Sequence, residues 1–165
     1  MPRISSSYTR TQIILHWAIA LLILAQFLDS DAISHLMRDL GITASSSADI
    51  TLGVQLHVFA GILTLVLMVV RLGLRYIAGA PALPEEESSV MKMIAHATHI
   101  ILYVALLLMP ISGLVGWFGQ VEAALVAHNI IKVVLLAFVF LHIAGALYHQ
   151  FVLKNNLIKR MTFRK

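Results

Sequence analysis

Apolar residues gather in four long runs, which short polar connections separate. The runs cover residues 11–28, 51–74, 91–117 and 121–153. Because a helix needs about 20 predominantly apolar residues to cross the hydrocarbon core of a bilayer, each run is long enough to span a membrane. The pattern therefore predicts an all-α fold, a transmembrane four-helix bundle that forms a single domain over residues 1–165.

The composition agrees with a membrane setting and narrows the chemistry. Apolar residues make up 59% of the chain and charged residues 12%, against about 25% charged residues in soluble domains. The absence of cysteine excludes disulfides, thiolate ligands, iron–sulfur clusters and covalent haem attachment through cysteine. The first run is expected to remain as a span, because no small-residue cleavage site follows it.

The polar connections predict the path of the chain. Residues 29–50 form a polar loop, in which a short amphipathic helix is predicted around residues 33–40. The second connection, residues 78–89, contains Pro81, Pro84 and three consecutive glutamates. The third, near residues 119–122, is so short that the last two helices are expected to form an antiparallel hairpin.

Lysine and arginine residues fall mainly on one side of this topology. Ten of the twelve lie in the amino terminus, the second connection and the carboxyl tail. By the positive-inside rule, both termini are expected on the cytoplasmic side of a bacterial inner membrane. Arg38 and Lys132 are left for the outer side. The net charge of +4 then reflects topology and contact with anionic lipid, and nucleic acid is not expected as a partner.

Two histidines fourteen residues apart in the last run, His128 and His142, are the strongest chemical signal. With 3.6 residues per turn and a rise of about 1.5 Å per residue, they share nearly one helix face and lie about 21 Å apart. The topology pairs them by depth with histidines of other helices, His57 with His128 on the outer side and His16 with His142 on the inner side. Because intramembrane histidine is rare and usually functional, two ligand positions are predicted.

Two imidazoles from different helices are what a six-coordinate b-type haem requires, so two haem b groups are predicted as cofactors. Small residues beside the ligands would let a flat ring approach the backbone. Gly53 and Gly61 flank His57 at four residues on either side, and Gly145 follows His142. The alternative is that these glycines only pack helices against each other.

Three further histidines and one tryptophan have more than one interpretation. His99 is the main rival of His16 as the inner ligand, and His96 and His99 are also candidates to bind lipid, haem propionates or quinone. His149 lies on the same stripe as the inner ligand, where it lines a substrate pocket or forms an interfacial side chain hydrogen-bonded to water. Trp17 is a candidate for the quinone pocket, or else an interfacial or core aromatic residue.

Three cations are candidates for the haem sites. Arg71 and Arg75 lie four residues apart at the inner end of the second run, where guanidinium groups would neutralise haem propionates. A positive-inside anchor explains Arg75 equally well. Lys132, one turn after His128, would hold a propionate or draw an anionic substrate toward the iron. Its alternative is snorkelling to the membrane interface.

Five segments of the chain, in order, are YTRTQIILHW (8–17), LHVFAGILTLVLMVVRLGLR (56–75), AHATHIILY (95–103), MPISG (109–113) and LHIAGALYHQFVLKNNLIKRM (141–161). In these segments the chain resembles the bacterial cytochrome b561 family of di-haem membrane cytochromes. The resemblance implies that the first, second and fourth helices supply the haem ligands. These carry over to His16, His57, His128 and His142, the same four residues that the spacing indicates.

The resemblance also implies a superoxide oxidase, which passes electrons from superoxide at the outer haem to ubiquinone near the inner haem. It places His149 near the quinone, as a contact or a proton donor. The outer loops are net acidic, so Lys132 and Arg38 would have to attract the superoxide anion. Two alternatives stay open: a membrane subunit that connects a partner dehydrogenase or hydrogenase with quinone, and a haem-free carrier or scaffold with structural histidines.

Overall fold

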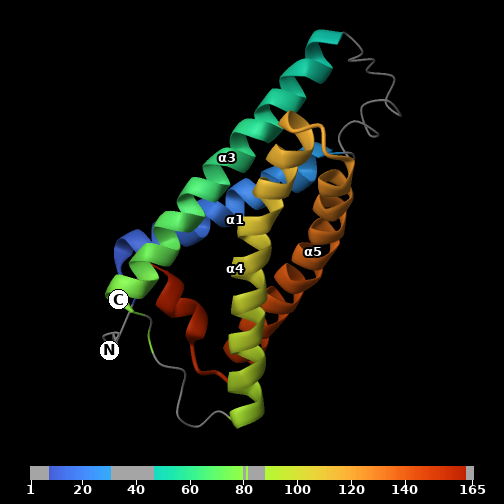
Figure 1. Cartoon of the computed structure of the whole chain (residues 1–165). Helices are drawn as coiled ribbons and strands as arrows, with labels where there is room; N and C mark the ends of the chain where they lie inside the picture. Colours follow the sequence, from blue (N-terminus) through green and yellow to red (C-terminus); the bar gives the residue numbers. More distant parts are fainter. Residues whose placement is uncertain (1–7, 31–46, 80, 82–87, 163–165) are drawn as a thin grey trace, which may run out of the picture.

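Four long helices and one short 3₁₀ helix make up the described part of the chain (Figure 1). The computed structural model describes residues 8–30, 47–79, 81 and 88–162, without the side chains of residues 29–30 and 47–53. The helices are α1 (Arg10–Ser30), α3 (Ser47–Ala78), α4 (Ser89–Phe118) and α5 (Glu122–Phe151), followed by η1 (Leu157–Met161). All four long helices are long and apolar enough to cross a membrane. The predicted fold class is confirmed.

The helix ends differ from the ends of the apolar runs because capping groups, and not hydropathy, stop a helix. At the start of α1, Thr9 Oγ1 accepts from the backbone nitrogen of Gln12 (3.2 Å), and Gln12 Oε1 accepts from the backbone nitrogen of Thr9 (2.9 Å). This reciprocal pair is a capping box. At the other end of the chain, α5 ends at Phe151, and the backbone nitrogen of Val152 donates to the carbonyl of Tyr148. Lys154 and Asn156 then adopt left-handed conformations (φ 54° and 57°) before η1 begins.

Gln12 also connects two helices. Its Nε2 donates to the backbone carbonyl of Gly79 (3.0 Å), which fastens the start of α1 to the end of α3. Gly79 ends α3 with φ 75°, a left-handed conformation that suits glycine because a Cβ would be strained there. The two ends are thus joined by a side chain that caps one helix and binds the terminus of the other.

The packing of the bundle centres on α4. This helix packs against α5 and α3, while α1 packs mainly against α3. A short turn at residues 119–121 joins α4 to α5, and the two run antiparallel as expected (Figure 1). The start of α1, the end of α3, the start of α4 and the end of α5 gather at one end of the molecule, as the up-and-down topology requires (Figure 1).

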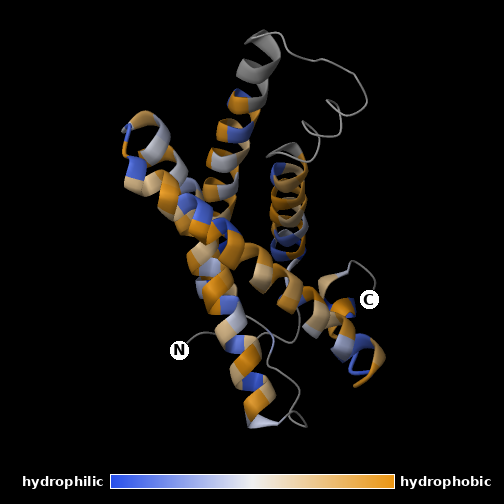
Figure 2. Ribbon diagram, turned by 90° about the vertical axis from the view of Figure 1, so that its right-hand side faces the viewer, coloured by the Kyte–Doolittle hydropathy of each residue, from blue (hydrophilic) through white to orange (hydrophobic). Residues whose placement is uncertain are grey.

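A small apolar core lies part-way along the helices. Its buried members come from all four long helices: Ile19, Met68, Leu102, Ala105, Leu106 and Leu135. Most other apolar side chains face outward, and the helices are predominantly hydrophobic along their length (Figure 2). Such a surface suits lipid, in which close packing and internal hydrogen bonds hold helices together in place of the hydrophobic effect.

We expect Gly116→Ala to destabilise the α4–α5 hairpin. A Cβ at Gly116 would lie 2.7 Å from Leu125 Cγ and 3.2 Å from the Leu125 backbone nitrogen, so the helices must move apart at a cost of about 1–3 kcal/mol. Unfolding by sodium dodecyl sulfate in mixed micelles measures this loss. Gly73→Ala is the matched control, because a Cβ there meets nothing within 4 Å. Equal stability of the two variants would contradict the close packing.

Candidate functional site

Two imidazole rings from α3 and α5 face each other near one end of the bundle, and we call this the α3–α5 site. The ring centroids of His57 and His128 lie 6.3 Å apart, and the ring planes are inclined by 69°. Both histidines line a cavity of 340 Å³, which is also lined by Gln26, Gly61 and Lys132. The structure thus brings together the two histidines paired by depth and places Lys132 at the same cavity.

The ring of His128 is held by α4. Its Nδ1 lies 2.8 Å from the carbonyl oxygen of Met109 and 3.3 Å from Ser112 Oγ. Because a carbonyl only accepts, Nδ1 must carry the proton, and the lone pair of Nε2 is left for a metal. A Cβ at Gly113 would lie 3.1 Å from both Nδ1 and Cε1 of the ring. Glycine at this position therefore gives the imidazole room to reach the carbonyl.

A second pair of rings, from α1 and α5, forms what we call the α1–α5 site. The ring centroids of His16 and His142 lie 6.1 Å apart with an interplanar angle of 71°. His99 of α4 is close to the same site, with its centroid 5.2 Å from that of His142. His99 Nδ1 donates to the carbonyl of Ala95 (2.6 Å) if it carries the proton, which leaves Nε2 as an acceptor. Both His16 and His99 are therefore within reach of the helix that the two sites share.

Ring separation provides a test of whether these residues fit haem. A bond of about 2.0 Å from metal to imidazole nitrogen, plus roughly 1.1 Å from nitrogen to ring centre, puts two axial imidazoles about 6.2 Å apart. The His57–His128 and His16–His142 separations, 6.3 and 6.1 Å, match this value. The His99–His142 separation of 5.2 Å is too short. The donor sets of both sites fit a b-type haem. Within the described residues, no three or more histidine or acidic side chains are grouped to bind a bare metal ion.

The space beside the predicted ligands is also compatible with a haem. A Cβ at Gly61 would meet Gln26 and Pro110 only at 3.8 and 4.0 Å, and a Cβ at Gly145 would meet nothing within 4 Å. Neither glycine is required by tight helix packing, which was the alternative explanation. Gly53 lies in α3 but outside the residues whose side-chain surroundings are described, as does the predicted loop containing Arg38.

Two arginine side chains lie near the α1–α5 site. Arg71 Nη1 donates to the carbonyl of Gln12 (2.8 Å), and its charge acts on both His16 and His142. Arg75 lies over the ring of Tyr103, with Cζ 5.5 Å from the centroid. Among the described side chains the one carboxylate is that of Glu122, which lies at the start of α5 and so at the other end of the bundle. An anionic group such as a haem propionate fits this neighbourhood.

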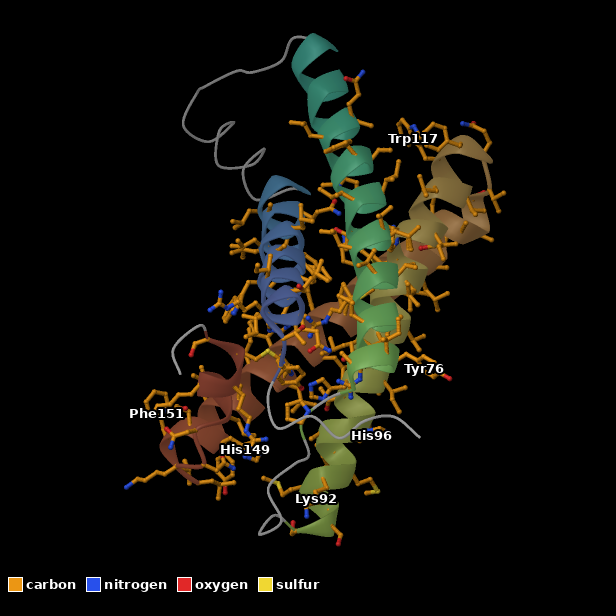
Figure 3. The ribbon with its side chains drawn as sticks, turned by 90° about the vertical axis from the view of Figure 1, so that its left-hand side faces the viewer. Tyr76, Lys92, His96, Trp117, His149 and Phe151 are labelled. Carbon is orange, nitrogen blue, oxygen red and sulfur yellow. The ribbon has the colours of Figure 1, made fainter. Side chains whose placement is uncertain are left out.

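The segment after α5 lies at the end of the bundle that contains the α1–α5 site. His149 is buried, with 8% of its surface exposed, and its Nδ1 lies 2.8 Å from Asn155 Nδ2. This burial argues against a water-exposed interfacial histidine. Trp17 Nε1 donates to the carbonyl of Met161 (2.8 Å), so η1 returns to the residue next to His16. His149 lies beside this returning segment in Figure 3.

His96 has a different setting from His99. It is exposed on the first turns of α4, as is visible in Figure 3, where Lys92 lies one turn earlier on the same helix. A role for His96 at the quinone therefore stays a prediction without a contact that supports it.

Four contributors to the sites were not predicted from the sequence. Gln26 contacts His57, the carbonyl of Met109 and the missing side chain of Gly113 position His128, and Asn155 contacts His149. Gln26 had a signal, since a lone amide within an apolar run needs a polar partner. Gly113 lies in the MPISG segment that carries the family resemblance, but its contact with His128 was not predicted. The carbonyl of Met109 and the side chain of Asn155 had no signal, because a backbone carbonyl and a loop asparagine are ordinary at their positions.

Comparison with known proteins agrees with the geometry. The family model described as prokaryotic cytochrome b561 matches residues 7–164. The chain belongs to this family. Cytochrome b562 of Cereibacter sphaeroides is 33% identical over 154 residues, which cover 93% of this chain and 94% of the relative. The chain is thus a multi-pass bacterial membrane protein for electron transfer, and the family implies haem b as its cofactor. The predicted resemblance is confirmed, and the haem-free carrier is set aside.

We expect Gly113→Val to weaken haem binding at the α3–α5 site. The added side chain would occupy the space that His128 uses to reach the Met109 carbonyl, so the ring loses its fixed orientation. Haem per chain, measured as the pyridine haemochrome, should fall by up to one group, and Gly73→Val should retain the wild-type content. An unchanged haem content in Gly113→Val would show that this contact does not position the ring.

Proposed function

We propose that this family member is a di-haem superoxide:ubiquinone oxidoreductase, which moves electrons across the membrane along α5. The observation that carries the proposal is the pair of imidazole separations, 6.3 and 6.1 Å, at two sites that share one helix. His128 and His142 lie fourteen residues apart on that helix, so the two sites are separated by about 21 Å along its axis.

His57 and His128 would hold one haem, and His16 and His142 the other. When bound, a haem with two imidazole ligands supplies one-electron transfer without a vacant coordination position. The protein's part is to fix the rings: His128 donates from Nδ1 to the Met109 carbonyl, which keeps Nε2 available. Arg71, next to the α1–α5 site, is proposed to neutralise a propionate, with Arg75 close by on the same helix.

The end of the bundle with the α1–α5 site is proposed to face the cytoplasm. Described cations are concentrated there: Arg10, Arg71, Arg75, Lys92, Lys154, Lys159 and Arg160. Positive residues are retained on the cytoplasmic side during insertion. Both termini would then be cytoplasmic, and the α3–α5 site would face the outer side of the bacterial inner membrane.

Superoxide is the proposed donor at the α3–α5 site. Two superoxide anions each lose one electron and become dioxygen, while one ubiquinone gains two electrons and two protons. Lys132 lines the same cavity as His57 and His128, so its charge favours entry of an anion. His57 and His128 would hold a haem that accepts the electron without binding superoxide directly, so the residues at the cavity need only admit the anion.

Ubiquinone is proposed to bind near His149 and Trp17. His149 is buried beside Asn155, and Trp17 is adjacent to His16 in α1. This places a titratable side chain and an aromatic surface close to the α1–α5 site, on the side where the quinone would take up protons. His99, near His142, is a further candidate contact.

We expect His128→Ala to lose the haem of the α3–α5 site alone and His142→Ala to lose the haem of the α1–α5 site alone. His16→Ala should match His142→Ala, whereas His99→Ala should keep two haems because its ring is too close to His142 for a shared iron. Pyridine haemochrome counts and circular dichroism separate loss of a ligand from loss of fold. Retention of both haems in His16→Ala, with one lost in His99→Ala, would show that His99 and not His16 is the ligand opposite His142.

Superoxide added to purified, quinone-loaded protein should reduce the haems faster than superoxide dismutates. Lys132→Gln should lower the second-order rate constant about 10-fold at low ionic strength, and the difference should shrink at high salt. Stopped-flow absorbance measures both rates. Absence of haem reduction by superoxide, with reduction through a dehydrogenase or hydrogenase instead, would assign the chain as the membrane subunit of such a complex.

A further inference from the structure

We propose that Gln26 of α1 is a positioning residue for the α3–α5 site, which orients His57 and sets how strongly its ring donates to iron. The inference rests on the proposed function, in which His57 is a haem ligand. Gln26 is proposed to act through the ring of His57.

The side-chain amide of Gln26 bridges two groups of α3. One end lies 2.7 Å from His57 Nδ1 and 3.3 Å from the His57 carbonyl oxygen, and the other end lies 3.2 Å from the backbone nitrogen of Gly61. With its nitrogen toward the ring, the amide donates to Nδ1 and to the carbonyl, while its oxygen accepts from Gly61. This arrangement requires the proton of the ring on Nε2.

Iron on Nε2 reverses that requirement. The ring then carries its proton on Nδ1, and the end of the amide at 2.7 Å must be an acceptor. We infer that the amide turns over when the site is loaded, so that Oε1 accepts from Nδ1–H. The turn gives up the two longer contacts, at 3.3 and 3.2 Å, for one short hydrogen bond to the ligand.

The neighbouring positions leave the amide room to turn. Gly61 has no side chain, and a Cβ built there would lie 3.8 Å from the nearer end of the Gln26 amide. Gln26 also lines the same 340 Å³ cavity as His57 and His128. A larger residue at position 61 would narrow the space between α1 and α3 at this point.

The two rings of the site are thus supported in different ways. His128 donates to a backbone carbonyl, that of Met109 (2.8 Å), which substitution of a side chain does not remove. The orientation of the His57 ring depends on the side chain of Gln26, which a substitution can change. A hydrogen-bond acceptor at Nδ1 gives an imidazole more anionic character, and such a ligand favours ferric over ferrous iron. Gln26 is therefore the side chain through which the potential of this haem is adjusted independently of the other.

The test compares Gln26→Met with Gln26→Glu in the intact haem-loaded protein. Methionine has a similar length but provides no acceptor comparable to the amide oxygen, so the midpoint potential of one haem should rise. Glutamate is a stronger acceptor, so the same potential should fall. The largest g value of that haem in the oxidised protein, measured by electron paramagnetic resonance, should also move, because it depends on ligand orientation and basicity.

Gln55→Met and Gln55→Glu are the matched controls. Gln55 lies two residues before His57 in α3 and is exposed, so the same substitutions place the same charge near the ligand without a hydrogen bond to its ring. The control variants should show a smaller potential shift and unchanged g values. Equal shifts for the Gln26→Glu and Gln55→Glu variants would overturn the proposal, as would shifts of the same sign for both Gln26 variants.

His57→Ala separates this inference from the proposed function. Loss of one haem in His57→Ala, with wild-type potentials and g values in both Gln26 variants, would overturn the role of Gln26 and leave the ligand assignment standing. Retention of both haems in His57→Ala would overturn the ligand assignment itself. The haem that responds to Gln26 must be the one that remains in His142→Ala, and a response from the other haem would contradict the inference.

Discussion

The pairing of imidazoles between helices is the constraint on which the rest of the structure depends. A polar ring within an apolar helix must find a partner, because lipid offers none. α5 carries two such rings, His128 and His142, and each lies opposite a ring from a different helix. α3 must therefore approach α5 near one end of the bundle, and α1 must approach it near the other. The apolar core, with Leu135 between the two histidines, fills the space between these approaches.

α4 makes this arrangement possible although neither predicted haem pair includes one of its residues. It packs along α5 and against α3, and its small residues Gly113 and Gly116 let the α5 side chains His128 and Leu125 come close. The helix continues through Pro110, and the carbonyl of Met109, just before the proline, accepts a hydrogen bond from Nδ1 of His128. The same turn of α4 therefore continues the helix and orients the imidazole.

Much of the molecule could be predicted because its main signals are periodic along one dimension. Length and hydropathy define the four helices, and a fixed rise per residue converts the fourteen-residue spacing into a distance along α5. The depth argument also paired His57 with His128 and His16 with His142, since antiparallel helices reverse depth in a simple way. Helix ends were less predictable, because they depend on caps such as the Thr9–Gln12 pair and on left-handed residues such as Gly79.

Contacts between helices followed from packing and not from spacing. The sequence by itself determined that histidines of known depth lie on four apolar helices, because helix geometry relates residue number to height. It paired His16 with His142 by depth but kept His99 as a rival, since His99 lies on the same side of the membrane. Only the tertiary structure distinguished them, with centroid separations from His142 of 6.1 and 5.2 Å. It also brought Gln26 to His57 and Asn155 to His149, because the azimuth of a side chain and the distance between helix axes are fixed by how the helices pack.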